Sequence, residues 1–337
     1  MGVSEMKVAV LGWYGHGNFG DDQVILRGLQ NLFKDWEVVV MSSDDKGTYP
    51  MIDINRVNEC DLFVLGGGEL IGPNYLFMFP PVKIPRQVQR LYARSSLSHR
   101  PWFHKITIPK VILGCGVNIE RPDELRSNVV KDLEQFDYIG LRDNKSVEIL
   151  RLIPQLEDKV HLFHDLGFSI NIEGIGHSHY SDRAVVIPTD RFTFSDRGVQ
   201  ECNVAMKSWR WLKERLEPYK KHIYLAFGGE DNNDLQTCRT LSLSCSNDGQ
   251  IVNCSRLSLE RIVEIIGDSS LTFPYRLHGL ILSFLTGTKY EFYPYHRKLQ
   301  RVHDTITGLD PKEIQRKQKA SFNEITNRMI NRPIADV

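Results

Sequence analysis

Short apolar runs of strand length alternate with helix-like segments through most of the chain. In the first half these runs lie at residues 7–13, 36–42, 61–68, 110–117, 138–143 and 159–165. Periodic stretches that predict helices lie between them, at residues 22–34, 123–136 and 144–152. Nearly continuous apolar strands separated by helices are typical of a parallel sheet covered on both faces. The first half is therefore predicted to form a Rossmann-like α/β domain.

A polar segment, NIEGIGHSHYSD, interrupts this pattern at residues 171–182, and the alternation then starts again. Strands are predicted at residues 183–189, 221–229, 249–254, 269–275 and 289–294. Helices are predicted at residues 198–218, 232–242, 257–267 and 278–287. With 337 residues the chain is long enough for two domains. We predict Rossmann-like domains over residues 1–175 and 182–310, and a terminal helix or tail over 311–337 that can cross back to the first domain.

Composition excludes several classes of protein. Lysine plus arginine equals aspartate plus glutamate at 42 each, so net charge gives no reason to expect nucleic-acid binding. Six cysteines form no CxxC pair, which favours reduced thiols over disulfides, and no metal site is expected. The start of the sequence shows no signal-peptide pattern, and no apolar run approaches the roughly 18 residues of a membrane span. A cytoplasmic protein is expected.

The first strand is followed by a glycine-rich turn, GWYGHGNFGDD, at residues 12–22. Ligands of such sheets bind beyond the carboxyl ends of the strands, and glycines let the backbone approach them closely. We favour a ligand-binding turn over a purely structural one, with Gly17, Asn18, Asp21 and Asp22 as candidate contacts. The turn also has GxGxxG spacing, but no acidic residue ends the second strand at the expected place, so a nucleotide cofactor is disfavoured.

The third strand ends in GGGEL at residues 66–70. Consecutive glycines cost conformational entropy, which favours a loop that approaches a ligand. Gly67, Gly68 and Glu69 are therefore candidate site residues. The side chain of Glu69 either points toward the ligand or caps the next helix.

Residues 70–119 contain no aspartate or glutamate, but they carry seven lysines and arginines interleaved with aromatic side chains. One interpretation is peripheral contact of segment 70–110 with the inner face of a membrane, or attraction of an anionic substrate. The other is an irregular insertion whose charges pair with acids elsewhere.

In the second domain, charged residues again follow the predicted strands. Arg191 follows the first and Glu230 the second, while Arg276 and His278 start the helix after the fourth. A helix amino terminus favours anions, and arginine offers a bidentate fork to phosphate or carboxylate. A lone histidine is usually structural, but next to this arginine and a bound anion His278 is suited to act as a general acid.

Four segments together resemble the polysaccharide pyruvyl transferase family over about residues 7–300. They are GWYGHGNFGDD, VLGGGEL, DYIGLRDNKSVEIL and RLHGLILSFLTGTKYEFYPYHRKL. The resemblance implies a GT-B-like α/β architecture, with two Rossmann-like domains facing each other across a cleft. It also implies transfer of the enolpyruvyl-derived group of phosphoenolpyruvate to a hydroxyl pair of a sugar, glycan or lipid-linked oligosaccharide, which gives a pyruvate ketal. Phosphoenolpyruvate is then the donor substrate, and no cofactor is expected.

The resemblance further implies that Arg276, Leu277 and His278 form the phosphoenolpyruvate site, with Arg191 as a second anion clamp. The second domain would hold the donor and the first domain the acceptor. The sequence leaves four candidates for the base that deprotonates the acceptor hydroxyl: Asp21, Asp22, Glu69 and Glu230. Two other functions remain open, a GT-B glycosyltransferase that uses a nucleotide sugar and a catalytically silent glycan-binding module.

Overall fold

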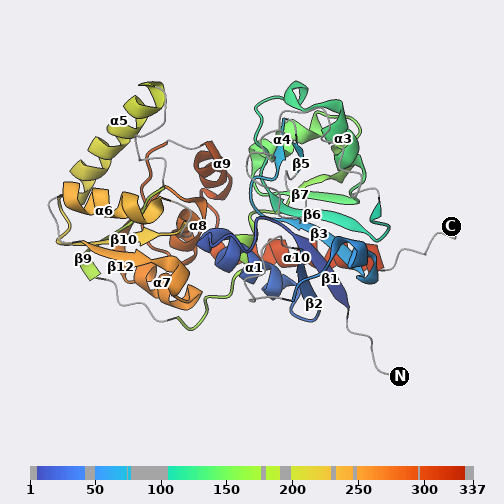
Figure 1. The fold of residues 1–337 in the computed structure, drawn as a ribbon, viewed down its shortest axis with the longest axis horizontal. Coiled ribbons are helices and arrows are strands. Elements are labelled where there is room, and N and C mark those ends of the chain that lie inside the picture. The colour runs from blue at the N-terminus through green and yellow to red at the C-terminus, as the bar shows by residue number, and fades with distance from the viewer. Residues whose placement is uncertain are drawn as a thin grey trace. The chain divides into compact units, whose positions relative to one another are not determined.

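The computed structural model describes most of the chain. The described residues are 6–41, 50–73, 75–76, 105–175, 180–189, 199–228, 233–245, 249–294 and 297–330. They divide into two compact units, drawn in Figure 1. Unit 1 comprises Met1–Gly15, Ile25–Ser169 and Thr305–Val337, and unit 2 comprises His16–Val24 and Ile170–Asp304. The chain thus enters unit 2 twice, first through the glycine-rich turn and then through its second half.

Unit 1 is built on a six-stranded parallel sheet with the order β2-β1-β3-β6-β7-β8. The strands are β1 (Lys7–Leu11), β2 (Glu37–Met41), β3 (Leu62–Gly66), β6 (Lys110–Cys115), β7 (Tyr138–Leu141) and β8 (Val160–Leu162). Each lies within a predicted apolar run, because a strand buried on both faces needs apolar side chains at successive positions. A short antiparallel pair, β4 (Ile71–Gly72) and β5 (Tyr75–Leu76), follows β3.

Helices cover both faces of this sheet (Figure 1). They are α1 (Leu26–Leu32), α3 (Ser127–Glu134), α4 (Asn144–Arg151) and α10 (Pro311–Ile330), with 3-10 turns η2 (Ile54–Glu59), η4 (Pro122–Glu124), η5 (Glu157–Lys159) and η6 (Leu166–Ser169). Val8 and Val10 of β1 pack in a core with residues of α1 and α10, whereas Ala9 and Leu11 pack in the core that α3 and α4 complete. The alternation along β1 shows that its two faces support two separate cores.

Unit 2 contains a four-stranded parallel sheet with the order β11-β10-β9-β12. Its strands are β9 (Tyr180–Ile187), β10 (Lys221–Ala226), β11 (Gln250–Asn253) and β12 (Ser269–Pro274). Its helices are α5 (Val199–Leu216), α6 (Asp234–Ser244), α7 (Leu259–Gly267), α8 (Leu277–Leu285) and α9 (Arg297–Ile306), with the 3-10 turn η8 (Cys254–Arg256). Ala184 and Val186 share a core with Leu212 of α5 and Leu241 of α6. On α8, Gly279 approaches Ile187 at the end of β9.

The strand predicted at residues 289–294 is wrong. Tyr290 forms only an isolated bridge to Thr272, in which the Thr272 amide donates to the Lys289 oxygen and the Glu291 amide donates to the Thr272 oxygen, at 2.9 and 3.0 Å. Pro274, two residues beyond Thr272 on β12, lacks the backbone N–H that the next bond of this ladder would need, and the pairing does not continue. Helix α9 was not predicted, although Leu299, Val302 and Ile306 on it are buried at helical spacing.

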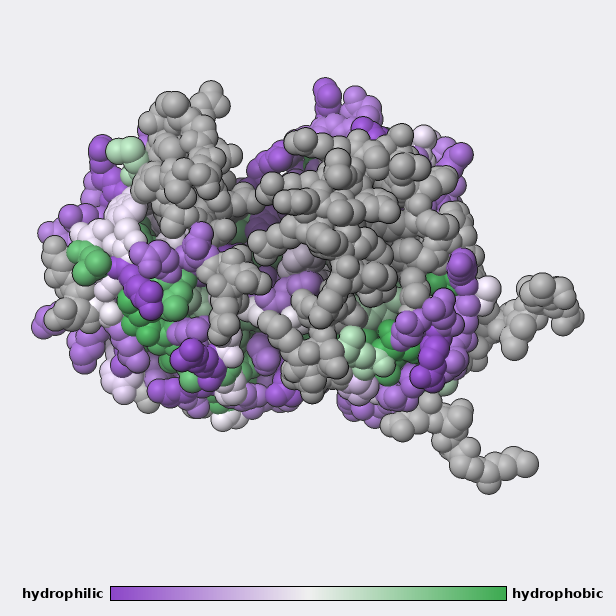
Figure 2. Space-filling view, viewed as in Figure 1, coloured by the Kyte–Doolittle hydropathy of each residue, from purple (hydrophilic) through white to green (hydrophobic). Residues whose placement is uncertain are grey.

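Membrane association was considered from the helices and from the surface of the described residues. No helix in the described part of the chain is long and apolar enough to cross a membrane. On the face shown in Figure 2, hydrophilic residues cover much of the described surface, with smaller hydrophobic areas on both units. Most of segment 70–110, for which membrane contact was considered, lies outside the described residues.

His164, between β8 and η6, makes the stability of unit 1 sensitive to acid. The residue is buried and holds a left-handed backbone with φ of 61°. Burial, with a smaller effect of Lys317, lowers the pKa of its imidazole from 6.5 to about 4. The unfolded chain therefore binds a proton at a higher pH than the folded chain does. The contribution of the neutral His164 imidazole to stability is fully present above pH 6.5, and we expect about 3 kcal/mol of it to be lost as the pH falls from 6.5 to about 4.

The test is urea unfolding of the wild type and His164→Asn between pH 4 and 7. Asparagine tolerates the left-handed backbone but does not titrate. The free-energy difference between the two proteins should change by about 3 kcal/mol across this window. A difference that stays constant with pH would rule out His164 as the titrating group.

Candidate functional site

The predicted donor residues lie at the carboxyl edge of the unit 2 sheet, where β12 leads into α8. Arg276 is the N-cap of α8, in an extended conformation (φ −108°, ψ 136°), and its side chain does not bond to the first turn of the helix. Leu277 and His278 begin the helix and are both buried, with His278 9% exposed. The Arg276 side chain is 19% exposed. The amino terminus of α8 therefore carries a guanidinium and an imidazole within four residues of the end of β12.

A buried carboxylate holds the Arg276 guanidinium. Arg276 donates through Nε to Oδ2 of Asp234 at 3.1 Å and through Nη2 to Oδ1 at 2.5 Å. Asp234 is the first residue of α6 and has no exposed surface. Its Oδ2 also accepts the Gly228 amide at 2.7 Å, just after β10. Asp234 was not predicted from the sequence, because the prediction gave weight to residues directly after strands. Asp234 lies farther along the chain, beyond the loop that joins β10 to α6.

The glycine-rich turn is closed by its own polar side chains. The Gly17 amide donates to Oδ2 of Asp22 at 2.7 Å, and the Gly20 amide donates to Oδ1 of Asn18 at 3.2 Å. The Asn18 side-chain amide donates to Oδ2 of Asp21, which is itself buried. Gly17 has a φ of 73°, which favours glycine. The turn ends in a π-helical segment, η1 (Gly20–Ile25), that leads directly into α1.

This turn packs against His278. A Cβ atom on Gly20 would lie 1.9 Å from Nδ1 of His278, so the imidazole fits there only because residue 20 is glycine. The Phe19 amide donates to the Phe227 oxygen at 2.8 Å, and the two rings lie 4.8 Å apart. The sequence analysis placed the turn in the first domain. Its contacts put residues 16–24 in unit 2, because Phe19 and Gly20 pack on the end of β10 and on α8.

In unit 1, the GGGEL loop lies at the carboxyl edge of the six-stranded sheet. Gly67 and Gly68 have φ values of 70° and 73°. The chain after Glu69 forms β4, so Glu69 does not cap a helix. Its Oε1 accepts from Nη2 of Arg142 at 3.3 Å. The Arg142 side chain is only 3% exposed and lies against Gly116, where a Cβ would be 2.4 Å from its guanidinium carbon.

Arg142 belongs to the local structure that starts α4. The adjacent Asp143 caps this helix, since its Oδ1 accepts from the Ser146 amide at 2.8 Å and its Oδ2 accepts from the Ser146 hydroxyl at 2.9 Å. Arg142 was not singled out from the sequence. The two remaining predicted site residues, Arg191 and Glu230, lie outside the described residues.

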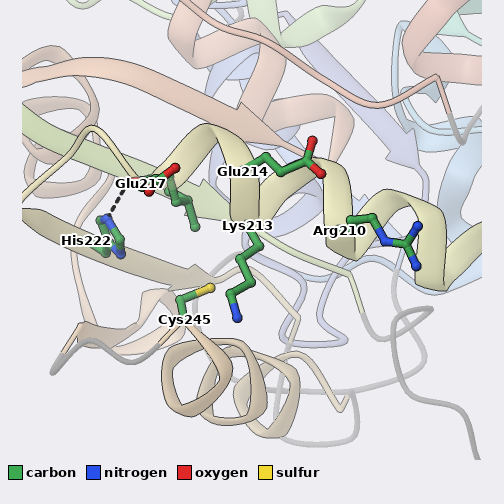
Figure 3. A pocket seen from close by; sticks show the side chains of 7 residues that line it. Arg210, Lys213, Glu214, Glu217, His222 and Cys245 are labelled. Atoms are coloured by element: carbon green, nitrogen blue, oxygen red, sulfur yellow. Dashed lines mark hydrogen bonds between the residues drawn. The ribbon is translucent and has the colours of Figure 1, made fainter.

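A pocket of about 410 Å³ lies at the opposite, amino-terminal edge of the unit 2 sheet (Figure 3). It is lined by Arg210, Lys213, Glu214, Leu216, Glu217, His222 and Cys245. His222 Nε2 donates to the carbonyl oxygens of Leu216 and Tyr219 at 3.1 and 3.0 Å, and burial lowers the pKa of this imidazole. His222 therefore supports the end of α5, and this pocket contains none of the predicted site residues.

The predicted site contains acids, bases and backbone donors. Among the described residues, no group of three or more histidine, cysteine, aspartate or glutamate side chains could hold a metal ion. At the carboxyl edge of the unit 2 sheet the structure brings together an arginine, a histidine, a helix amino terminus and a glycine-rich turn. Such a set is suited to bind an anion and transfer a proton to it.

Comparison with known proteins gives a family and a fold. The family model described as polysaccharide pyruvyl transferase matches residues 18–289. The chain is also similar to the solved UDP-N-acetylglucosamine 2-epimerase from Rickettsia bellii, with 10% sequence identity, coverage of 97% of this chain and 96% of that chain, and a TM-score of 0.52. For the UDP-GlcNAc 2-epimerase from Methanocaldococcus jannaschii the identity is 11%, the coverage is 97% of this chain and 93% of that chain, and the TM-score is 0.50. A third similar structure is that of S. aureus MnaA with UDP, with 10% sequence identity, coverage of 96% of this chain and 90% of that chain, and a TM-score of 0.51.

At these identities the structural similarity concerns the fold alone, and it confirms the predicted GT-B-like α/β fold class. A comparison with curated proteins found no match.

Proposed function

Because the chain belongs to the polysaccharide pyruvyl transferase family, we propose that it transfers the enolpyruvyl-derived group of phosphoenolpyruvate to two hydroxyls of a sugar. The product is a pyruvate ketal on a glycan or lipid-linked oligosaccharide, and inorganic phosphate is released. The observation that carries the proposal is the joint placement of Arg276 and His278 at the start of α8, packed against the glycine-rich turn.

Phosphoenolpyruvate presents a phosphate and a carboxylate, and both need directional cationic or amide donors. Arg276 supplies a planar fork whose orientation Asp234 fixes, and the amino terminus of α8 adds a region of positive potential. We assign the donor site to Arg276, Leu277 and His278, with Arg191 as the second anion clamp. Both arginines would stabilise the phosphate as it departs.

The proposed reaction starts with a proton transferred from His278 to the methylene carbon of phosphoenolpyruvate, which becomes a methyl group. The oxygen of one sugar hydroxyl bonds to the adjacent carbon and loses its proton. The bond from that carbon to the phosphate oxygen breaks, and phosphate leaves with the electron pair. A second hydroxyl then completes the ketal. Of the two hydroxyl protons, one restores the histidine and the other leaves with phosphate, so the equation balances.

The described residues predicted to contact the acceptor belong to both units. In unit 1, the Glu69 carboxylate is oriented by the buried Arg142 and retains 32% exposure of its side chain. In unit 2, Gly17, Asn18, Asp21 and Asp22 form the closed turn that seats His278. Asp21 and Asp22 are engaged in closing this turn and Glu69 is paired with Arg142, so the base for the acceptor hydroxyl stays open among Asp21, Asp22, Glu69 and Glu230.

The direct test is incubation of the full chain with phosphoenolpyruvate and a panel of glycans and lipid-linked oligosaccharides, with release of inorganic phosphate as the readout. The same panel is run with nucleotide sugars, scoring nucleotide release. We expect acceptor-dependent phosphate release. Nucleotide release in its place would identify a glycosyltransferase, and binding of glycans without turnover of either donor would identify a silent module.

Replacing Arg276 by alanine should weaken phosphoenolpyruvate binding roughly 100-fold, which corresponds to about 2.7 kcal/mol. The reason is the loss of charge-assisted hydrogen bonds to an anionic group of the substrate. Calorimetric titration with phosphoenolpyruvate measures the effect. Arg183→Ala is the control, because Arg183 also pairs with an aspartate of unit 2, Asp268, at 4.0 Å. Equal weakening in both variants would contradict the donor assignment.

A further inference from the structure

Among the described residues, Asp234 is a fully buried carboxylate next to the proposed donor site. Asp234 has no exposed surface, whereas the Arg276 guanidinium that it holds is 19% exposed. Burying a carboxylate costs free energy unless a partner and hydrogen bonds compensate it. Here Asp234 accepts from two guanidinium nitrogens and from the Gly228 amide, so Arg276 supplies part of this compensation.

Both oxygens of Asp234 contact Arg276, and this defines the plane of the guanidinium. A single contact would allow the arginine to rotate about that bond, but the paired Nε–Oδ2 and Nη2–Oδ1 contacts fix its orientation. Asp234 is itself held in place, because Oδ2 accepts from Gly228 and the residue begins α6. The orientation of Arg276 is thus set by α6 and by the loop that follows β10, both of which lie outside its own helix.

We propose that Asp234 is a positioning residue that orients Arg276 toward the phosphoenolpyruvate anion. The inference rests on the proposed function and adds to it a residue that acts only through Arg276. The pair carries no net charge, so Arg276 recognises the substrate through the direction of its N–H donors, and loss of that direction lowers catalysis even when the arginine remains.

The experiment is a double-mutant cycle of Asp234→Asn and Arg276→Lys, with kcat/KM for phosphoenolpyruvate measured by phosphate release. Asparagine keeps an oxygen that can accept from Gly228 but provides only one acceptor oxygen for the guanidinium. We expect D234N to lower kcat/KM 10- to 100-fold. We also expect the double variant to match R276K within about threefold, since residues that act through one another are not additive.

Three outcomes would overturn the inference. One is a D234N enzyme with wild-type kcat/KM, and a second is a double variant whose loss equals the product of the two single losses, which indicates that Asp234 supports α6 independently of Arg276. In both cases the wild type still releases phosphate, so the proposed function stands. A wild type that releases none from phosphoenolpyruvate removes the function and this inference together.

Two further variants separate positioning from folding. Asp234→Glu keeps the buried charge but moves the carboxylate by one methylene, and we expect at least a tenfold loss of kcat/KM per folded molecule. An active D234E enzyme would contradict the inference even if D234N fails to fold. Asp268→Asn, which removes a charge from another aspartate–arginine pair of unit 2, should leave kcat/KM unchanged.

Discussion

Replacement of His278 by alanine should lower phosphate release from phosphoenolpyruvate by about 10²- to 10⁴-fold, the usual contribution of a general acid. The imidazole is 9% exposed, begins α8 next to Arg276, and is seated against Gly20. In the proposed reaction no carbon–oxygen bond forms at the central carbon until the methylene carbon is protonated. Removing the proton donor should therefore lower kcat while phosphoenolpyruvate binding changes much less.

The matched control is His222→Ala. His222 is also a buried histidine of unit 2, but it lies at the other edge of the sheet and bonds to backbone carbonyls. We expect this variant to lose stability and to keep its kcat per folded molecule. If H278A retained activity comparable to H222A, His278 would not be the proton donor.

Gly20→Ala should abolish most of the activity without a substrate contact being removed. The φ of Gly20 lies outside the left-handed region, so alanine is permitted by the backbone. Its Cβ, however, would lie 1.9 Å from Nδ1 and 2.8 Å from Cγ of His278, a distance at which the imidazole must move. Because catalytic geometry tolerates little displacement, we expect at least a 100-fold fall in kcat/KM for phosphoenolpyruvate.

A double variant shows whether the clash is the cause. In Gly20→Ala with His278→Ala the imidazole is gone, so the double variant should be no less active than H278A alone. Its melting temperature should exceed that expected from the sum of the two single changes. Strictly additive losses of stability would show that alanine at position 20 disturbs the turn itself rather than His278.

The strands could be predicted from the sequence because burial on both faces imposes uninterrupted apolar runs. Nine of these runs contain a whole strand of the two parallel sheets, and the tenth, 183–189, contains all of β9 except its first three residues. The segment 289–294, KYEFYP, is rich in aromatic residues, but its strand pairing ends at one bridge, since Pro274 lacks the next backbone donor. The apolar content of one segment cannot show that a neighbouring strand lacks a backbone N–H donor, so this strand was predicted in error.

The site was predictable where its residues are adjacent in sequence. Arg276, Leu277 and His278 follow one strand and start one helix, and the structure places them so. Asp234 is 42 residues from Arg276, and only the pairing of β10, β9 and β12 brings the two together. The glycine-rich turn was assigned to the first domain because its neighbours along the chain belong to that domain. Its contacts with Phe227 and His278 are long-range, so a local pattern could not place it in unit 2.

The central claim is that the chain uses phosphoenolpyruvate as its donor, and equilibrium titration tests it without knowledge of the acceptor. Wild-type protein is titrated calorimetrically with phosphoenolpyruvate and, separately, with UDP-sugars. We expect saturable binding of phosphoenolpyruvate that inorganic phosphate displaces, and no comparable binding of the UDP-sugars. Saturable binding of a UDP-sugar together with no binding of phosphoenolpyruvate would contradict it.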